Sequence, residues 1–141
     1  MNYRELSEKV CEIRKEGERF LARYEDEIVD FLRKDAGNAE DHLQKEIVFE
    51  FLDNLHGMCH MAEYMGLEVT KEGILGLDSQ GELTLDGEVL PLMTEVEVKL
   101  YDKEEKQEIW TRTYVAGAKN RYLVGIDRSC PLIGMRARMR G

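Results

Sequence analysis

The side chains best suited to chemistry lie close together in the segment His56-Gly57-Met58-Cys59-His60. On a helix, His56 and His60 would lie one turn apart on the same face, and this spacing lets two imidazoles bind one Zn²⁺. Cys59 or a neighbouring carboxylate could then add a further ligand. Both histidines nevertheless fall among acidic residues on the polar arc, whereas Cys59 projects about 100° away, towards the apolar side. Exposed histidines are therefore favoured over a metal site, and we expect no metal and no other cofactor.

A second group of interest is a row of arginines near the C-terminus, which alternate with Met135, Ala137 and Met139. In a strand, this alternation places the arginines on one face and the apolar residues on the other. Together with nearby aromatic residues they form a candidate binding face, which comprises Trp110, Arg112, Tyr114, Arg121, Tyr122, Arg136, Arg138 and Arg140. Small β-barrels bind single-stranded nucleic acid with such a combination. Alternatively, the aromatic residues belong to the core and the arginines pair with Glu95, Glu97 or the acidic helices.

Motifs that carry catalysis are missing from the sequence. None of the three serines lies in a Gly-x-Ser-x-Gly turn, and there is neither a Walker loop nor a dinucleotide-binding fingerprint. Cys130 lies near Arg128, which could activate its thiol, but the C-terminal half contains no histidine. A structural cysteine is therefore favoured, and we expect that the protein is not an enzyme.

Charge is distributed unevenly along the chain of 141 residues, whose net charge is −9. Residues 1–70 hold 17 acidic and 9 basic side chains, whereas residues 112–141 hold one acidic and seven basic side chains. Such asymmetry indicates an anionic partner, or an acidic surface within the same assembly. The negative total argues against a surface that coats nucleic acid, so nucleic acid is a less favoured partner.

The location of the protein is predicted by what the sequence lacks. No apolar run approaches the roughly 20 residues of a membrane span, and the N-terminus lacks the apolar segment of a signal peptide. Three widely spaced cysteines do not make a disulfide framework. We therefore expect a cytoplasmic protein with reduced thiols and no membrane partner.

The elements that position these side chains change in kind at Gly66. Before it, apolar residues recur in steps of three and four, which predicts helices over about 3–34 and 39–65 that form an antiparallel hairpin. The segment 34–38 predicts the turn, with Asn38 as the N-cap of the second helix. Gly17 interrupts the apolar stripe of the first helix, and it would let a neighbouring helix approach closely.

The second helix carries more apolar surface than one partner helix can bury. Its apolar residues cover about half of the helix circumference, which exceeds the seam that an antiparallel neighbour fills. The remaining surface must meet either the C-terminal domain or a second copy in a four-helix bundle. We expect a homodimer through helix 39–65, while packing against the C-terminal domain stays open.

After Gly66, short alternating segments separated by glycine-containing turns are typical of strands. We expect five or six antiparallel strands, over about 73–77, 82–85, 95–101, 109–115, 121–126 and 135–140. So many short strands in a small domain suggest a barrel, because closure removes exposed edges. The sequence thus predicts an α+β protein with a helical hairpin (1–66) and a small antiparallel β-barrel-like, SH3-like domain (67–141).

A resemblance to a known family supports the compact β domain. The segments Trp110-Thr111-Arg112, Tyr122-Leu123-Val124-Gly125 and Leu132-Ile133-Gly134-Met135-Arg136-Ala137-Arg138 resemble those of an uncharacterised small β-domain family (domain of unknown function 5348). That family occurs in Gram-positive bacteria and their mobile elements. The resemblance covers roughly residues 73–141, and it implies neither an activity nor catalytic residues.

These patterns together predict a non-enzymatic interaction module, and the resemblance implies a bacterial one. The helical hairpin would serve self-association, and the β domain would present the basic and aromatic face to a protein partner. The alternative is a nucleic-acid-binding accessory protein of a mobile element. A metal-dependent enzyme that uses His56 and His60 is the least favoured interpretation.

Overall fold

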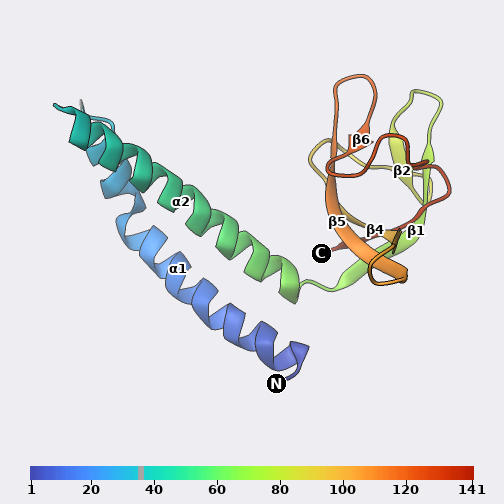
Figure 1. Cartoon of the computed structure of the whole chain (residues 1–141), viewed down its shortest axis with the longest axis horizontal. Coiled ribbons are helices and arrows are strands. Elements are labelled where there is room, and N and C mark those ends of the chain that lie inside the picture. Colours follow the sequence, from blue (N-terminus) through green and yellow to red (C-terminus); the bar gives the residue numbers. More distant parts are fainter. Residues whose placement is uncertain (35–36) are drawn as a thin grey trace. The chain divides into compact units, whose positions relative to one another are not determined.

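The computed structural model describes residues 1–34 and 37–141 of the chain. Contacts between residues divide the chain into two units, Met1–Leu67 and Glu68–Gly141. The first unit consists of two long helices, and the second is an antiparallel β-sheet that curls into a half-barrel (Figure 1). The predicted α+β class, with a helical hairpin followed by a small antiparallel β domain, is therefore confirmed.

Both helices begin at an asparagine whose side chain caps the first turn. Helix α1 (Tyr3–Leu32) begins with a capping box, in which the Asn2 side chain accepts a hydrogen bond from the Glu5 amide at 2.9 Å. Helix α2 (Ala39–Gly66) is capped by Asn38, as predicted, since its side chain accepts from the Asp41 amide at 2.9 Å. Each cap satisfies a backbone N–H that has no partner within the helix. Of the predicted turn at 34–38, residues 35 and 36 lie outside the described part of the chain.

The two helices run antiparallel (Figure 1), and they approach each other closely at Gly17. Gly17 is buried, and a Cβ atom at this position would lie 2.9 Å from Cys59 Sγ and 3.1 Å from Leu55 Cδ1. The prediction that this glycine permits a close helix contact is thus confirmed. The central buried cluster of the hairpin is small and consists of Leu21, Leu52 and Cys59, while Leu32, Ala62 and Tyr64 are buried elsewhere in the helices. Burial raises the pKa of the Cys59 thiol, because a thiolate is poorly solvated there.

The sheet contains seven strands in the order β3-β2-β1-β7-β4-β5-β6, and its strand pairs are antiparallel. The strands are β1 (Val69–Leu77), β2 (Leu83–Leu85), β3 (Glu88–Val89), β4 (Glu95–Asp102), β5 (Gln107–Ala116), β6 (Tyr122–Leu123) and β7 (Arg136–Arg140). Strand β3 was not predicted, and β6 is shorter than the predicted strand over 121–126. Gly125 explains the early end of β6, because its φ of 77° turns the chain out of the sheet.

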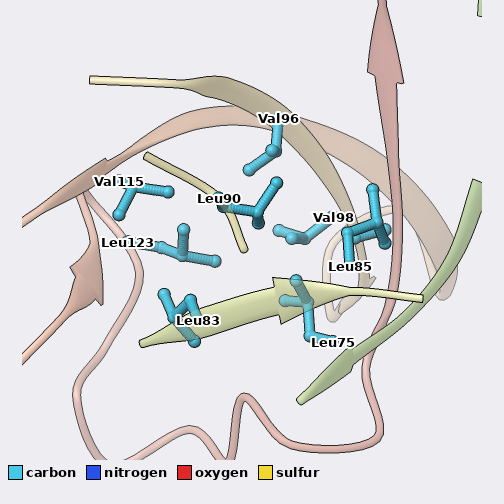
Figure 2. Packing of buried hydrophobic residues seen from close by; sticks show 9 residues of the cluster. Leu75, Leu83, Leu85, Leu90, Val96, Val98, Val115 and Leu123 are labelled. Atoms are coloured by element: carbon cyan, nitrogen blue, oxygen red, sulfur yellow. The ribbon is translucent and has the colours of Figure 1, made fainter. Parts of the chain in front are cut away.

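The last strand, β7, completes the sheet by lying between β1 and β4. Its residue Ala137 is fully buried, while Met135 and Met139 pack against the same core cluster. The arginines of this strand therefore project from the opposite face, as the alternating pattern predicted. Figure 2 shows how the leucine and valine side chains of the other strands and loops converge inside the curled sheet, where the buried cluster comprises Leu75, Leu83, Leu85, Leu90, Val96, Val98, Val115, Leu123 and Ala137.

Candidate interaction surfaces

The arginines of β7 are held in ion pairs by glutamates on the neighbouring strands. Glu97 on β4 accepts from Arg138 Nε at 2.5 Å and from Arg140 Nε at 2.6 Å. Arg136 donates to Glu72 on β1 at 2.6 Å. The Glu97 side chain is only 8% exposed, so its charge depends on these two guanidinium groups for compensation. The arginines of β7 are thus held by ion pairs with glutamates of the same sheet.

Trp110 lies among cations on the same face of the sheet. The Arg138 guanidinium lies 4.0 Å from the centroid of its ring, and Lys99 Nζ lies 5.5 Å from it. Arg112 pairs directly across from Glu97 in the β4–β5 register, and Tyr114 follows two residues later on β5. Residues opposite each other on adjacent strands share a face. The structure therefore brings together six of the eight predicted face residues: Trp110, Arg112, Tyr114, Arg136, Arg138 and Arg140.

The other two predicted face residues lie around β6 and form separate contacts. Arg121 pairs with Glu82 at 2.9 Å and also donates to the backbone carbonyls of Gly117 and Ala118. Tyr122 lies beneath Arg128, whose guanidinium is 4.2 Å from the ring centroid. Arg121 therefore holds the loop before β6 in place.

The β unit carries a small excess of negative charge. The unit Glu68–Gly141 contains 13 acidic and 11 basic side chains. A polyanion would have to compete with Glu72 and Glu97 for the arginines of β7. The acidic partners Glu72 and Glu82 were not predicted from the sequence, because they lie 64 and 39 residues away from the arginines they contact.

His56 has an acidic partner on the first helix. His56 Nε2 lies 2.5 Å from Glu25 Oε1. Side chains lean towards the N-terminus of their own helix, so in an antiparallel pair these two converge from different levels. Among the described residues, no group of three histidine, cysteine, aspartate or glutamate side chains could hold a metal ion. The pair His56–Glu25 is a polar contact between the two helices.

The side of the hairpin opposite the His56–Glu25 contact is apolar. It is defined by pairs of residues, one from each helix, that repeat every seven residues. Phe20 and Phe51 lie edge to face, with ring centroids 6.2 Å apart. One heptad further along, Ile13 and Met58 line the same groove. Because seven residues make two helical turns, both pairs lie on one side of the hairpin. The next pair in this series is Leu6 and Met65.

We call this surface the apolar side, and most of its residues are open to solvent. It comprises Leu6, Ile13, Phe20, Tyr24, Phe31, Ile47, Phe51, Met58, Met61 and Met65. All but the partly buried Phe20 are between 37 and 69% exposed. The sequence predicted the α2 half of this surface.

A groove between the helices gives the apolar side a concave centre. It has a volume of about 180 Å³ and is lined by Val10, Ile13, Arg14, Met58, Cys59 and Ala62. Almost all of its wall is apolar. Methionine side chains adapt their shape to a partner, so such a groove can receive apolar side chains from another protein.

Comparison with known proteins yields no relative. The chain matches no family model, no curated protein and no solved structure. The resemblance of residues 73–141 to a bacterial β-domain family and the SH3-like assignment therefore stay predictions. None of the described helices is long and apolar enough to cross a membrane.

Proposed function

We propose that this protein is a non-enzymatic interaction module whose helical hairpin associates with a second copy through the apolar side. The observation that carries the proposal is the exposure of nine large apolar residues on one side of a hairpin whose central buried cluster consists, among the described residues, of Leu21, Leu52 and Cys59. A pair of helices with so small a core gains little from packing within one chain. A second hairpin would complete a four-helix bundle.

The exposed area of the apolar side is large enough for an interface with a second copy. A large apolar or aromatic residue has a surface of about 200 Å², and roughly half of it is exposed at each position. Nine such residues expose about 900 Å² of apolar surface on each copy. This area is close to the roughly 800 Å² that a stable complex buries on each partner. The apolar side is therefore large enough for a complete dimer interface, and it exceeds the isolated apolar patches that monomers commonly expose.

The distribution of charge also supports a second copy. Polar contacts such as Glu25–His56 lie on the other side of the hairpin, away from the apolar side. Two hairpins that meet through their apolar sides would therefore keep most of their acidic residues apart in solvent. The negative charge of residues 1–70 would then favour solubility without opposing association.

Phe51→Glu tests the proposal against a matched control two residues away. Phe51 is 53% exposed on the apolar side, while Phe49 is 37% exposed on the opposite side of α2. A carboxylate buried in an apolar interface without a partner should weaken association by roughly 100-fold. Phe49→Glu places the same charge where solvent can reach it, so it should leave association unchanged. Sedimentation velocity over a range of concentrations measures both, and equal association by the two variants would contradict the proposal.

Two further proposals concern the location of the protein and a nucleic-acid partner. Three free cysteines support a cytoplasmic location, because reducing compartments keep thiols unpaired. A nucleic-acid partner is less favoured, because Arg136, Arg138 and Arg140 already pair with glutamates. If nucleic acid binds despite these pairs, retention of an oligonucleotide should weaken steeply with salt.

A further inference from the structure

Strand β5 has a neighbour along only one of its edges for most of its length. On one side it pairs with β4 from Gln107 to Tyr114. On the other side its only strand neighbour is β6, which pairs with Val115 and Ala116. All residues of the β unit are described, so within this unit the segment 107–112 is an open edge of the sheet, which ends where the Thr113 hydroxyl donates to the Val124 carbonyl. Open edges are templates for pairing with another strand.

The direction of the backbone groups on this edge follows from two hydrogen bonds. The Val115 amide donates to the Thr94 carbonyl beside β4 at 3.0 Å, whereas the Tyr114 carbonyl accepts from the Val124 amide at 3.1 Å on the other side. Backbone groups alternate between the two edges of an antiparallel strand. Glu108 and Trp110 therefore direct their N–H and C=O groups to the open edge, where a further strand could pair with them.

We propose that this open edge pairs antiparallel with the same edge of a second copy, with Trp110 opposite Trp110. In this register Glu108 lies opposite Arg112 of the second copy, and Arg112 lies opposite its Glu108. Opposite charges at directly paired positions stabilise a sheet. The register also joins residues that face the open edge in both copies, so backbone hydrogen bonds form without a shift.

The composition of the edge favours a second copy as its occupant. Natural open edges are commonly protected by lysine or proline, and the segment 107–112 contains neither. Its charges are instead one acid and one base placed symmetrically about Trp110, so the edge is complementary to itself. Arg112 lies across from Glu97 within the sheet, and its guanidinium has five N–H donors, so contact with a second Glu108 does not require another contact to be lost. This edge is independent of the apolar side of the hairpin.

Glu108→Arg tests the pairing in the full-length chain that also carries Phe51→Glu, so that association through the hairpin is suppressed. Trp110 is the only tryptophan, so its fluorescence reports directly on the proposed contact. We expect the Phe51→Glu chain to associate as its concentration is raised to about 1 mM. Its tryptophan emission should change over the same range of concentration. Glu108→Arg should weaken this association roughly tenfold, because two attractive pairs become repulsive.

Two controls complete the experiment. Glu104→Arg makes the same charge change in the turn between β4 and β5, outside the proposed contact, and should leave association unchanged. Adding Arg112→Glu to Glu108→Arg exchanges the two charges and should restore association. The proposal is overturned if the Phe51→Glu chain stays monomeric with constant emission, or if Glu108→Arg associates as tightly as its parent. Association through the hairpin is judged separately, from the effect of Phe51→Glu alone.

Discussion

Alanine in place of Gly17 should destabilise the helical hairpin, although alanine is the better helix former. In an exposed helix the exchange would gain about 1 kcal/mol. The added methyl group would lie 2.9 Å from Cys59 Sγ and 3.1 Å from Leu55 Cδ1, both closer than van der Waals contact. Relief of such crowding typically costs about 1–3 kcal/mol. We therefore expect a net loss of about 1 kcal/mol in the free energy of unfolding.

Gly57→Ala is the matched control, because no described atom beyond its chain neighbours and its own helix backbone lies within 4 Å of the Cβ that Gly57 lacks. Here only the gain in helix propensity remains, so the hairpin should become more stable by about 1 kcal/mol. The free energies of unfolding of the two variants should thus lie on opposite sides of the parent value, about 2 kcal/mol apart. Cys59→Ala removes the sulfur that the new methyl group would meet, so Gly17→Ala should cost less in that background.

Urea unfolding measures these effects at a fixed protein concentration, since association adds to apparent stability. Far-ultraviolet circular dichroism follows the helices, while the fluorescence of Trp110, the only tryptophan, follows the β unit. Only the helical transition should move. A Gly17→Ala protein as stable as the Gly57→Ala protein would refute the close contact between the helices.

Further predictions concern Glu97 and Cys59. Glu97→Gln should lower the stability of the β unit by about 1–3 kcal/mol, because Arg138 and Arg140 lose their shared counter-charge; an unchanged urea midpoint by Trp110 fluorescence would count against this. Burial raises the pKa of the Cys59 thiol, so it should alkylate more slowly than partly exposed Cys130. Because folded Cys59 keeps its proton above the unfolded-state value of about 8.5, stability should fall as pH rises past that value, and Cys59→Ala should flatten the fall.

The hairpin was predictable because its information is local. Apolar steps of three and four gave two helices, and Asn38 marked the start of the second one. The end of α1 at Leu32 was placed two residues late, because the cap at Arg33 has no distinctive side chain. The turn beginning at Asp78 was also readable, since its carboxylate accepts from the amides of Gln80 and Glu82.

The order of the strands was not predictable, because it depends on contacts far apart in the sequence. Strand β7 lies between β1 and β4, and this placement decides that Arg138 meets both Glu97 and Trp110. Alternation alone indicated the face on which the arginines lie, but not which acids face them. The pairing of Arg121 with Glu82 likewise joins two loops that no local pattern connects.

The apolar side was only half visible in the sequence. The apolar residues of α2 exceeded what one partner helix could bury, and this gave the expectation of a dimer. The sequence of α1 carried no such indication, although its Ile13 and Phe31 are 55 and 69% exposed. Gly17 itself lies against Leu55 and Cys59 of α2, so only part of the stripe of α1 faces α2. Gly17 indicated a close contact, but which residues of the stripe stay exposed depends on how the two helices pack together.

The most direct test of association through the apolar side is the mass of the full-length chain in solution. Light scattering on the Glu108→Arg variant, at about 10–100 µM, removes any contribution from the β5 edge. We expect twice the chain mass of 16.4 kDa, and a single chain mass once Phe51→Glu is added. A mass of 16.4 kDa throughout that range, with the helices intact by circular dichroism, would contradict the proposed self-association.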